Sequence, residues 1–470
     1  MNDPCIGSGS FGRVYKHSSD NTVIKIAPFI SSDDDGGTSL ISNTLREANF
    51  YQFCNRLLSC SSLTCTQQDC HYKIYSSISK AVVSRNCDTV CFKLPNYGPT
   101  LNFIINKTKQ RTIHLFSQLA LAIWWLHSCN ISHGDVKPYN ITVTNDDRVH
   151  LIDFGSVCFH NYKGQSRDQR CTLAYVSPEE LLSNKYSKST DIWSFGCVLF
   201  EFVTNKKFIP CLLSIMNYNE HLISQFSLYL NGDRTDDSFD PKMFLIEIFT
   251  RVTYTQIHLT VERFVKDRDF QRWCKHCLVK DSLARINAAD LCNPDFGLVS
   301  TTLATLLTPL ELPHEQTFLS EYKDLHTTNI SYSLRKSCIQ FMLDCSKVYH
   351  LFPDNLFVCS VMMFDRYYFR KTSHCTYDEA ILVSLAIMCL QDAIRNNSNV
   401  QLDPIISFSR STTSDFLDIL YDIVDTLDWQ LYNKSPDCFV QKTDSAEWKQ
   451  ICETYPILHP TVPPILGLLT

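Results

Sequence analysis

The sequence contains no apolar run long enough to span a membrane. A spanning helix needs about 18 consecutive apolar residues, whereas the best run, Ile381 to Leu390, has only ten and is typical of a buried helix. The glycine-rich segment described below begins by Gly7, which leaves no room before it for a cleaved signal peptide. We therefore expect a cytoplasmic or nuclear protein without a membrane partner.

The chain also lacks an excess of positive charge, internal repeats and extended low-complexity tracts. It has 43 Lys and Arg against 49 Asp and Glu, so its net charge is -6. A nucleic-acid-binding surface needs a basic patch or stripe, and we therefore expect no nucleic-acid partner. The 44% of hydrophobic residues is typical of a globular protein, and a length of 470 residues favours two domains.

Cysteine, by contrast, is abundant, with 22 residues. In a secreted chain this count would indicate disulfides, but an intracellular chain is expected to keep free, partly buried thiols. Two clusters contain residue types that bind zinc, namely Cys60, Cys65, Cys70 and His71 in one, and Cys274 and Cys277 in the other. Neither has a second pair at zinc-finger spacing, so free thiols remain the favoured interpretation.

The hydrophobic pattern changes along the chain. Residues 4 to 100 predict short strands, an acidic loop at 31–39 and one helix at 42–58, whereas residues 101 to 300 are mostly helical. Pro309 and Pro313 interrupt the pattern and predict a linker at 301–330. Almost purely helical runs follow at 334–349, 356–369, 378–395 and 414–431. This order predicts a strand-rich lobe, a helical lobe, a linker and an all-helical domain.

The segment GSGSFGRV at residues 7–14 has the pattern Gly-x-Gly-x-x-Gly-x-Val, formed by Gly7, Gly9, Gly12 and Val14. Missing side chains let backbone amides approach phosphate oxygens. A dinucleotide-binding turn would open a helix, whereas this segment continues as strand, turn and strand. By itself the pattern also fits a glycine-rich hairpin without a ligand.

Lys25 lies inside the apolar stretch VIKIA, and a buried ammonium group needs an acidic partner. Glu47, in LREANF on the predicted helix, can supply that carboxylate. Such a pair can hold the ammonium group toward the α and β phosphates of a nucleotide. Either residue alone is equally consistent with a solvated side chain.

An ordered set of polar residues follows in HGDVKPYN and DFG. Asp135, Lys137 and Asn140 are followed 13 residues later by Asp153, directly after the apolar stretch VHLI. Phosphoryl transfer needs magnesium ligands and a base that face one another. Asp153 and Asn140 can hold magnesium, Asp135 can accept a hydroxyl proton, and Lys137 can stabilise the transferring phosphate.

With these motifs, residues 1 to about 300 resemble the eukaryotic protein kinase family. The SPE sequence ending at Glu179 looks like the Ala-Pro-Glu motif of the family, DIWSFG at 191–196 resembles its next helix motif, and Arg285 matches the late Arg that pairs with that Glu. The resemblance implies an α+β bilobal fold, with an amino-terminal lobe at 1–100 and a carboxy-terminal lobe at 101–300. The 106 residues between Glu179 and Arg285 indicate an insertion near 205–275.

The resemblance also implies ATP and Mg2+ as cofactors and proteins as substrates. It assigns catalytic roles to Lys25, Glu47, Asp135 and Lys137, and magnesium binding to Asn140 and Asp153. The residues expected to bind the nucleotide are Ile6, Gly7, Gly9, Gly12, Val14, Lys25 and Leu94, with Pro95 to Tyr97 as the hinge that contacts adenine through its backbone. Lys137 and Thr172 resemble the Ser/Thr-specific branch of the family, and His133 is expected to support the Asp153 segment.

Gly134 departs from the family pattern, because most regulated kinases carry an Arg before the catalytic Asp. That Arg is a fixed cation which a phosphate on the activation loop can neutralise. Gly134 removes the cation. We therefore predict activity that does not require phosphorylation of the loop between Ser156 and Ser177.

The region from 331 to 470 is similar to a cyclin box. In that fold an Arg of the first helix and an Asp of the second pair inside the bundle, and Arg335 and Asp365 occupy these places. Ala393 and Leu420 depart from the pattern, because they stand where cyclins commonly carry the Lys and Glu that contact a kinase. An unrelated helical extension on the kinase lobe is the alternative.

The combination predicts a Ser/Thr kinase whose cyclin-like domain activates it in cis, since a tether raises the local concentration of a domain to roughly millimolar. The sequence TLREA at 44–48 resembles the cyclin-docking helix of cyclin-dependent kinases. A virus-encoded fused kinase and cyclin, acting in its host cell, is a further hypothesis from the same resemblance. The competing function is a pseudokinase or cyclin-like adaptor that binds a host cell-cycle kinase.

Overall fold

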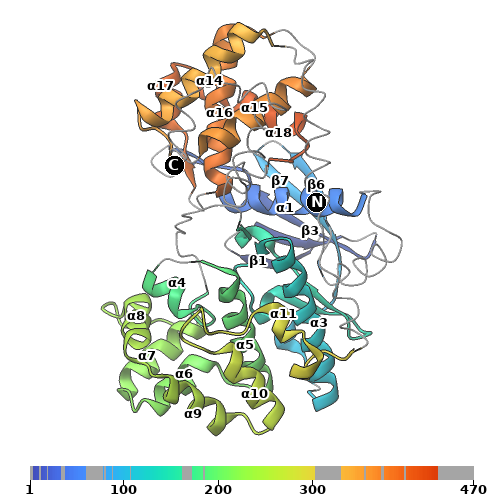
Figure 1. Ribbon diagram of the computed structural model, residues 1–470, viewed down its shortest axis with the longest axis vertical. Helices are drawn as coiled ribbons and strands as arrows, with labels where there is room; N and C mark the ends of the chain where they lie inside the picture. The colour runs from blue at the N-terminus through green and yellow to red at the C-terminus, as the bar shows by residue number, and fades with distance from the viewer. Residues whose placement is uncertain are drawn as a thin grey trace, which may run out of the picture.

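The chain stacks three parts along its long axis, with a sheet-rich lobe between a larger helical lobe and a separate helical bundle (Figure 1). The structure is a computed structural model and describes residues 4–9, 12–17, 20–32, 37–59, 78, 81–86, 88–105, 107–160, 172–183, 186–301, 330–353, 356–371, 375–395 and 399–431. The predicted linker at 301–330 lies almost wholly outside these residues, and the domain limits stay predictions.

A five-stranded antiparallel sheet with strand order β1-β2-β3-β7-β6 forms the sheet-rich lobe. Its strands are β1 (Cys5–Gly9), β2 (Gly12–Lys16), β3 (Thr22–Pro28), β6 (Val82–Asn86) and β7 (Thr89–Pro95). β-branched and aromatic residues, which favour strands, dominate the centre of the sheet. Helix α1 (Ser42–Ser59) packs against β6 and β7 and brings Glu47 beneath β3.

The larger lobe is organised around α3 (Lys109–Ser128) and α5 (Lys188–Thr204), whose apolar faces are buried. Helix α5 begins with a capping box in which Ser187 and Thr190 bond each other's backbone amides, so the start of this helix is fixed. The predicted pair between Arg285 and Glu179 is present at 2.6 Å and ties α4 to the end of the lobe. The remaining helices are α4 (Pro178–Ser183), α6 (Phe208–Ile215), α7 (Glu220–Asn231), α8 (Pro241–Arg251), α9 (Tyr254–Phe264), α10 (Arg268–Cys277) and α11 (Ala288–Leu291).

Short elements between α3 and α4 carry the predicted phosphate-handling residues. They are β8 (Ile131–Ser132), η2 (Pro138–Asn140), β9 (Ile141–Val143), β10 (Val149–Leu151), η3 (Phe154–Ser156) and β11 (Cys158–Phe159). Two single-turn helices, η1 (Leu101–Phe103) and η4 (Pro294–Phe296), lie near the two ends of the lobe in sequence. The strands β9 and β10 pair with each other, and β8 pairs with β11, so these short hairpin-like ladders fix the loop between them.

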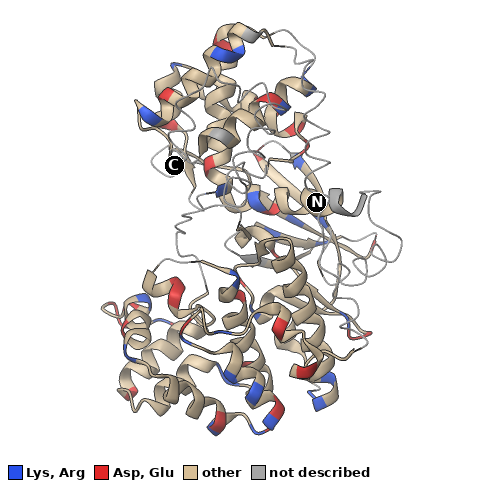
Figure 2. Cartoon of the chain, in the orientation of Figure 1, with Lys and Arg blue, Asp and Glu red and all other residues tan. Residues whose placement is uncertain are grey.

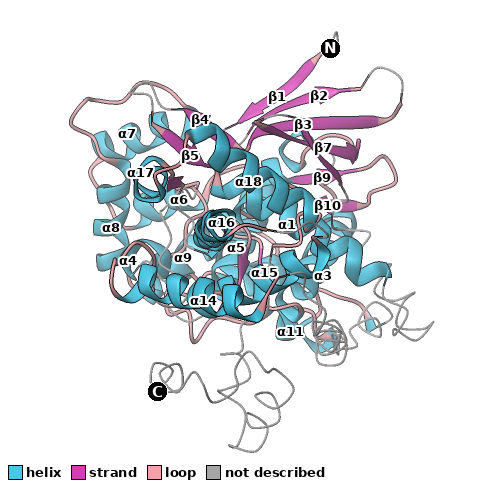
Figure 3. Ribbon diagram, turned by 90° about the horizontal axis from the view of Figure 1, so that it is seen from above, coloured by secondary structure: helices cyan, strands magenta, loops and turns pink. Residues whose placement is uncertain are grey.

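The helical bundle consists of α14 (Tyr332–Lys347), α15 (Phe357–Arg370), α16 (Tyr377–Arg395), α17 (Asp403–Ser409) and α18 (Thr413–Thr426). Helix α16 is buried along most of its length because α14, α15 and α18 pack around it (Figure 3). The predicted pair between Arg335 and Asp365 joins α14 to α15 through N–O distances of 2.6 and 2.9 Å. The last predicted helix ends five residues early, because Asp428 and Trp429 adopt left-handed φ angles of 48° and 58°.

The prediction of an acidic loop at 31–39 is wrong at both ends of that range. Residues Ile30–Ser32 form β4 and Thr38–Leu40 form β5, while 33–36 lie outside the described residues. Strand β5 also pairs with β12 (Val400–Gln401), which follows α16 in the helical bundle. The partner strand is 360 residues away in sequence, so a local pattern could not reveal it.

No helix among the described residues is both long and apolar enough to cross a membrane. The described cysteines carry free thiols, and no cluster of metal-binding side chains is present in the described part of the chain. Cys274 and Cys277 are buried, and burial raises the pKa of Cys277 to about 12. The cluster of Cys60, Cys65, Cys70 and His71 lies outside the described residues.

Candidate active site

Lys25, Glu47 and Asp153 meet at the junction of the sheet, α1 and η3. The Lys25 ammonium lies 2.6 Å from Glu47 Oε2 and 2.7 Å from Asp153 Oδ1. The predicted Lys25–Glu47 pair is therefore present, with a second carboxylate on the same ammonium group. Asp153 keeps one quarter of its side chain exposed, so its carboxylate borders solvent as well as Lys25.

Burial and charge act against each other in this cluster. Burial alone would lower the pKa of Lys25, but the Asp153 and Glu47 carboxylates outweigh burial and raise it. Burial raises the pKa of Glu47 to about 7, although the Lys25 ammonium opposes that shift. Burial would also raise the pKa of Asp153, but Lys25 holds it below the usual value. The shifts in pKa thus favour the charged forms of Lys25 and Asp153.

The segment around Asp153 is fixed by aromatic packing. Asp153 has a left-handed φ of 64°, which turns its carboxylate toward Lys25 while Phe154 turns the other way. Phe154 is fully buried and stacks on Phe50 of α1 with ring centroids 4.0 Å apart. His133 Nε2 lies 3.0 Å from the carbonyl of Ile152, the contact expected for its support of this segment. Helix α1 and the Asp153 segment therefore form one packed unit.

The second part of the site is a network around Asp135. Lys137 Nζ donates to Asp135 Oδ2 at 2.6 Å and to Thr172 Oγ1 at 3.0 Å, and the Thr172 hydroxyl donates to Asp135 Oδ1 at 3.1 Å. Asn140 Nδ2 donates to the carbonyl of Asp135 at 2.9 Å. Asn140 Nδ2 also lies 3.1 Å from Asp135 Oδ2, so Lys137, Asn140 and Thr172 hold the Asp135 carboxylate in one orientation.

The backbone before Asp135 is held by a buried carboxylate. Asp191 accepts from the amides of His133 at 2.8 Å and Gly134 at 2.9 Å, and it lies 2.9 Å from His127 Nε2. Gly134 has φ of 85°, in the left-handed region that favours glycine over residues with a side chain. The missing side chain at this position therefore has a conformational reason in addition to the loss of a cation.

The residues expected to bind the nucleotide share one face of the sheet. Gly7 pairs with Val14, Val14 with Lys25 and Val23 with Leu94, and directly paired residues project from the same side. Gly12 has φ of 141°, and a Cβ there would lie 2.4 Å from the Ile26 carbonyl, so only glycine fits. Gly9 faces Gly12 across the turn, whereas Ile6 lies at an irregularity in the β1–β2 register and is 54% exposed. At the predicted hinge, the Asn96 amide donates to the Asn21 carbonyl and Tyr97 stacks on His150.

The donor set near Asp153 fits a hard divalent cation. Asp153 offers carboxylate oxygens, and the amide nitrogen of Asn140 is engaged with Asp135, which leaves its oxygen as the ligand atom. Magnesium prefers such oxygen ligands. Asn140 and Asp153 are thus the residues that would hold a magnesium ion, and this assignment stays a prediction.

The sequence did not mark Arg46 or Asn43 as site residues. Arg46 is only 2% exposed, its Nε donates to the Gly155 carbonyl at 3.2 Å, and its guanidinium also bonds Asn43. Its Nη1 donates at 3.3 Å to the carbonyl of Ala393 in the helical bundle. The only signal in the sequence was the TLREA stretch, which suggested docking without naming the residue that carries it.

Comparison with known proteins agrees with this geometry. The model of the protein kinase domain matches residues 2–296, which is more than half of the chain. The chain belongs to the protein kinase family. This kinase has the α+β fold expected of its domain, followed by the helical bundle.

Several relatives match parts of the kinase domain. A probable cell division protein kinase of Encephalitozoon cuniculi is 30% identical over 208 residues, which are 44% of this chain and 71% of that protein. An Aurora kinase of Debaryomyces hansenii is 40% identical over 95 residues, 20% of this chain and 23% of that protein. Two Dictyostelium discoideum proteins, the probable serine/threonine-protein kinase dyrk2 and another probable serine/threonine-protein kinase, are 41% and 33% identical over 20% and 28% of this chain, but these matches cover only 10% and 8% of their own lengths. The comparisons give no support for a cyclin box or for a viral origin.

Proposed function

We propose that this kinase transfers the ATP γ-phosphate to Ser and Thr hydroxyls of proteins. The observation that carries the proposal is the network of Asp135, Lys137 and Thr172 beside the cluster of Lys25, Glu47 and Asp153. The first group offers a base and the second a phosphate-binding cation, both of which phosphoryl transfer needs. The relatives named as serine/threonine kinases support the specificity.

Each residue has a role that its contacts permit. Asp135 accepts the proton of the substrate hydroxyl, since both of its carboxylate oxygens are oriented by Lys137 and Thr172. Lys137 can turn its ammonium from Asp135 to the transferring phosphate, and Lys25 binds the nucleotide phosphates while Glu47 fixes its position. Asn140 and Asp153 would hold a magnesium ion, which would neutralise phosphate charge when bound.

Phosphate incorporation into a mixed protein substrate, with magnesium and labelled ATP, tests the activity. We expect incorporation on Ser and Thr by the full chain and none above background by the Asp135→Asn variant. This variant keeps the size of the side chain, and its amide oxygen can still accept from Lys137, while its amide nitrogen takes the place of the oxygen that accepts from Thr172. Equal incorporation by both proteins, or incorporation mainly on Tyr, would refute the proposal.

We further propose that the helical bundle activates the kinase in cis by docking on α1. Every residue from 42 to 51 is buried, although six of the first eight are polar or charged. A helix at the surface buries one apolar stripe, so burial on all sides indicates partners on two opposite faces. The Asp153 segment covers one face of α1, and α16 covers another.

The contacts between α1 and the bundle are polar and specific. At the start of α1, the amide of Ser42 donates to the side chain of Asn399 at 3.3 Å. Further along α1, the side chain of Asn49 accepts from the amide of Leu431 at 3.0 Å. The β5–β12 ladder and the bond from the Thr38 amide to Asp403, at 2.7 Å, extend the interface to the sheet side of α1. Both ends of the Glu47 segment are thus tied to the bundle.

Aromatic and ionic contacts widen this interface beyond α1. Phe29 packs edge-on against Trp429 with ring centroids 5.7 Å apart, and Arg85 forms an ion pair of 2.6 Å with Asp425. The Arg85 guanidinium also lies 4.4 Å above the ring of Tyr421. Because these residues belong to β6, the β3–β4 turn and the end of the bundle, docking fixes the small lobe as a whole.

A cleavable connection tests activation in cis. We would insert a protease site between residues 302 and 329 of the full chain and compare activity before and after cleavage. At protein concentrations of about 100 nM, cleavage lowers the effective concentration of the bundle roughly ten-thousandfold from the millimolar range. We expect activity to fall on dilution and to return at high concentration. Activity that is unaffected by cleavage, while the two pieces separate on gel filtration, would refute cis activation.

The adaptor function has less support. The face of α16 that would meet a separate kinase already contacts α1 of the same chain. A host cell-cycle kinase would have to displace that contact, and the tether opposes displacement. Capture of a cyclin-dependent kinase by the intact chain would favour the adaptor function over activation in cis.

A further inference from the structure

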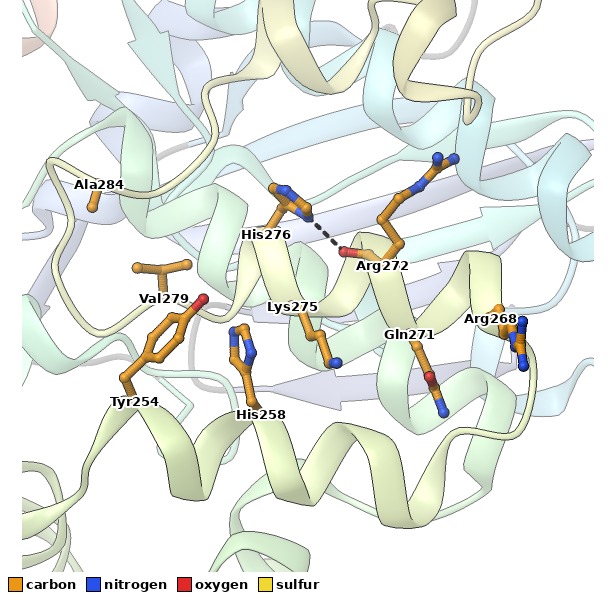
Figure 4. A pocket seen from close by; sticks show the side chains of 9 residues that line it. All are labelled: Tyr254, His258, Arg268, Gln271, Arg272, Lys275, His276, Val279 and Ala284. Carbon is orange, nitrogen blue, oxygen red and sulfur yellow. Dashed lines mark hydrogen bonds between the residues drawn. The ribbon is translucent and has the colours of Figure 1, made fainter.

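The larger lobe carries a cavity of about 520 Å3 between α9, α10 and the turn that follows α10. Figure 4 shows His258 of α9 and Lys275 of α10 pointing toward each other across it, with Arg268 at the start of α10. Arg272 and His276 also lie on α10, on the side that is farther from α9, and Tyr254 of α9 lies at one end of the cavity. None of these elements contributes a residue to the site described above.

The lining of the cavity is strongly basic. Of the nine described residues that line it, three are Lys or Arg, two are His and none is acidic. The segment 251–280 contains seven Lys and Arg against three Asp and Glu, in a chain whose net charge is -6. Figure 2 shows both blue and red segments at this end of the larger lobe.

The acidic residues nearby leave much of this charge uncompensated. Asp267 and Asp269 flank Arg268, but their carboxylates lie 2.8 and 2.7 Å from Lys109 of α3. Glu262 pairs with Lys275 at 2.5 Å, yet its side chain is 49% exposed, and an exposed pair of this kind is weak and screened by salt. An anion in the cavity would therefore meet an excess of positive charge.

The basic groups are held on a rigid support. Residues 268, 271, 272, 275 and 276 share one face of α10, while Phe270, Trp273, Cys274 and Cys277 on the other face are buried. The Arg272 guanidinium donates to the Phe296 carbonyl at 2.7 Å and lies over the ring of Phe296. A site that is positioned by packing loses less entropy when a ligand binds.

One buried polar atom points to a missing partner. His258 Nε2 is buried and has no hydrogen-bond partner among the described residues, although the ring stacks on Tyr254 with centroids 3.9 Å apart. Burial lowers the pKa of His258, and the positive charge of Lys275 lowers it further, while Glu262 and the backbone of Lys275 act in the opposite direction. A neighbouring anion would reverse the second effect and provide an acceptor for a protonated Nε2.

We propose that this cavity binds a phosphorylated Ser or Thr of a protein substrate. Clusters of Arg with Lys and His are the usual means by which proteins recognise phosphorylated residues, because a dianion accepts several charge-assisted hydrogen bonds at once. The volume lies in the range of sites that enclose a ligand far larger than free phosphate. It therefore has room for the residues that flank a phosphorylated side chain. The docking role rests on the proposed kinase activity, whereas phosphopeptide binding does not.

Fluorescence anisotropy of the full chain without ATP tests the site. The probes are labelled peptide libraries with phosphoserine, Ser or Glu fixed at the centre. We expect the phosphoserine library to bind at least about tenfold more tightly than the others, because a dianion makes more charge-assisted hydrogen bonds than either. Arg268→Gln with Lys275→Gln should remove that preference, whereas Arg251→Gln, which removes an exposed cation of α8 outside the cavity, should preserve it.

Three results would overturn the proposal. The first is equal binding of the three libraries, and the second is a preference for phosphoserine that survives the paired substitution. The third is displacement of the phosphoserine library by inorganic phosphate at the same concentration, which would indicate a site for an adventitious ion only. Phosphorylation of an unphosphorylated substrate is measured in parallel and should be unchanged in the paired variant, since Arg268 and Lys275 lie outside the active site. A wild-type chain that is an active kinase but shows no preference for the phosphoserine library refutes only the docking site, whereas a wild-type chain that binds the phosphoserine library but is inactive refutes only the proposed activity.

Discussion

Replacement of Arg46 by Met separates the docking of the bundle from the chemistry of the site. Met fills most of the volume of the Arg side chain but donates no hydrogen bond, so the bonds to Gly155 and Ala393 are lost together. A hydrogen bond from a charged group contributes about 1.5 to 3 kcal/mol. Met does not require the desolvation of a buried guanidinium, and this saving offsets part of the lost bonding. We therefore expect the ordered arrangement to lose about 3 kcal/mol of free energy. That loss corresponds to about a hundredfold shift away from the ordered arrangement.

The assay is the initial rate of protein phosphorylation, with ATP and protein substrate varied separately. We expect kcat/KM of Arg46→Met to fall by about ten- to a hundredfold, because Arg46 bonds the carbonyl of Gly155 and so positions the segment that carries Asp153. Amide hydrogen exchange at Ser42 and Leu431 should become faster, since both amides lie at the interface between α1 and the bundle.

A matched control is Arg111→Met. Arg111 pairs with Asp147 at 2.6 Å in the larger lobe, is also partly buried, and touches neither α1 nor the bundle in the contacts described above. Its rate should stay within about twofold of the wild type, as expected for a pair near the surface. If Arg46→Met keeps both the wild-type rate and the wild-type exchange at Ser42, then the connection from Ala393 through Arg46 to Gly155 does not hold the active site in place.

Four further predictions follow from the same contacts. Phosphatase treatment should leave the activity unchanged, because Gly134 offers no cation for a phosphate on the 156–177 loop; a loss that only rephosphorylation restores would contradict this. Since the pKa of Glu47 is raised to about 7, its charged form exists mainly above that pH, so the KM for ATP should rise as the pH falls from about 8 to about 6, with a flat profile in Glu47→Gln. Thr172→Val should lower kcat about tenfold with little change in KM, because it removes two hydrogen bonds that orient Asp135 and Lys137. Arg335→Met should cost the bundle about 3 to 5 kcal/mol in denaturant unfolding by leaving Asp365 buried and unpaired, and Arg335→Met with Asp365→Leu should recover most of it.

Contacts that a buried charge requires could be predicted from the sequence. Lys25 inside an apolar strand needed a carboxylate, so its pair with Glu47 could be predicted from residue type and order, whereas the pair of Arg335 and Asp365 was predicted from the resemblance to a cyclin box. The ordering of Asp135, Lys137, Asn140 and Asp153 likewise placed the site, because it follows from the chemistry of phosphate. The second carboxylate on Lys25 was not foreseen, since the two acidic residues had been assigned separate roles.

Contacts that depend on distant segments could not be read from the chain. Residues 38–40 look like part of a polar loop until β12 supplies the edge with which they pair. Gly134 could be recognised as a missing cation, but its φ of 85° depends on how Asp191 holds the loop from α5. The basic cavity combines α9 with α10, and neither helix alone predicts an enclosed space. In each case the local pattern is compatible with several partners, and only tertiary packing selects one.

Gly134 and Arg46 have a common explanation in the docked bundle. A buried guanidinium needs acceptors wherever it lies, and an activation-loop phosphate is one source of them. In this chain a carbonyl of α16 and the carbonyl of Gly155 accept from Arg46, so the guanidinium is satisfied without a phosphate. A second cation at position 134 would then add repulsion and burial cost without a phosphate to offset it, and the left-handed backbone there disfavours any side chain. Gly134→Arg should therefore lower activity even under conditions in which the 156–177 loop is phosphorylated, and a gain of activity in that variant would show that the bundle and a loop phosphate act together.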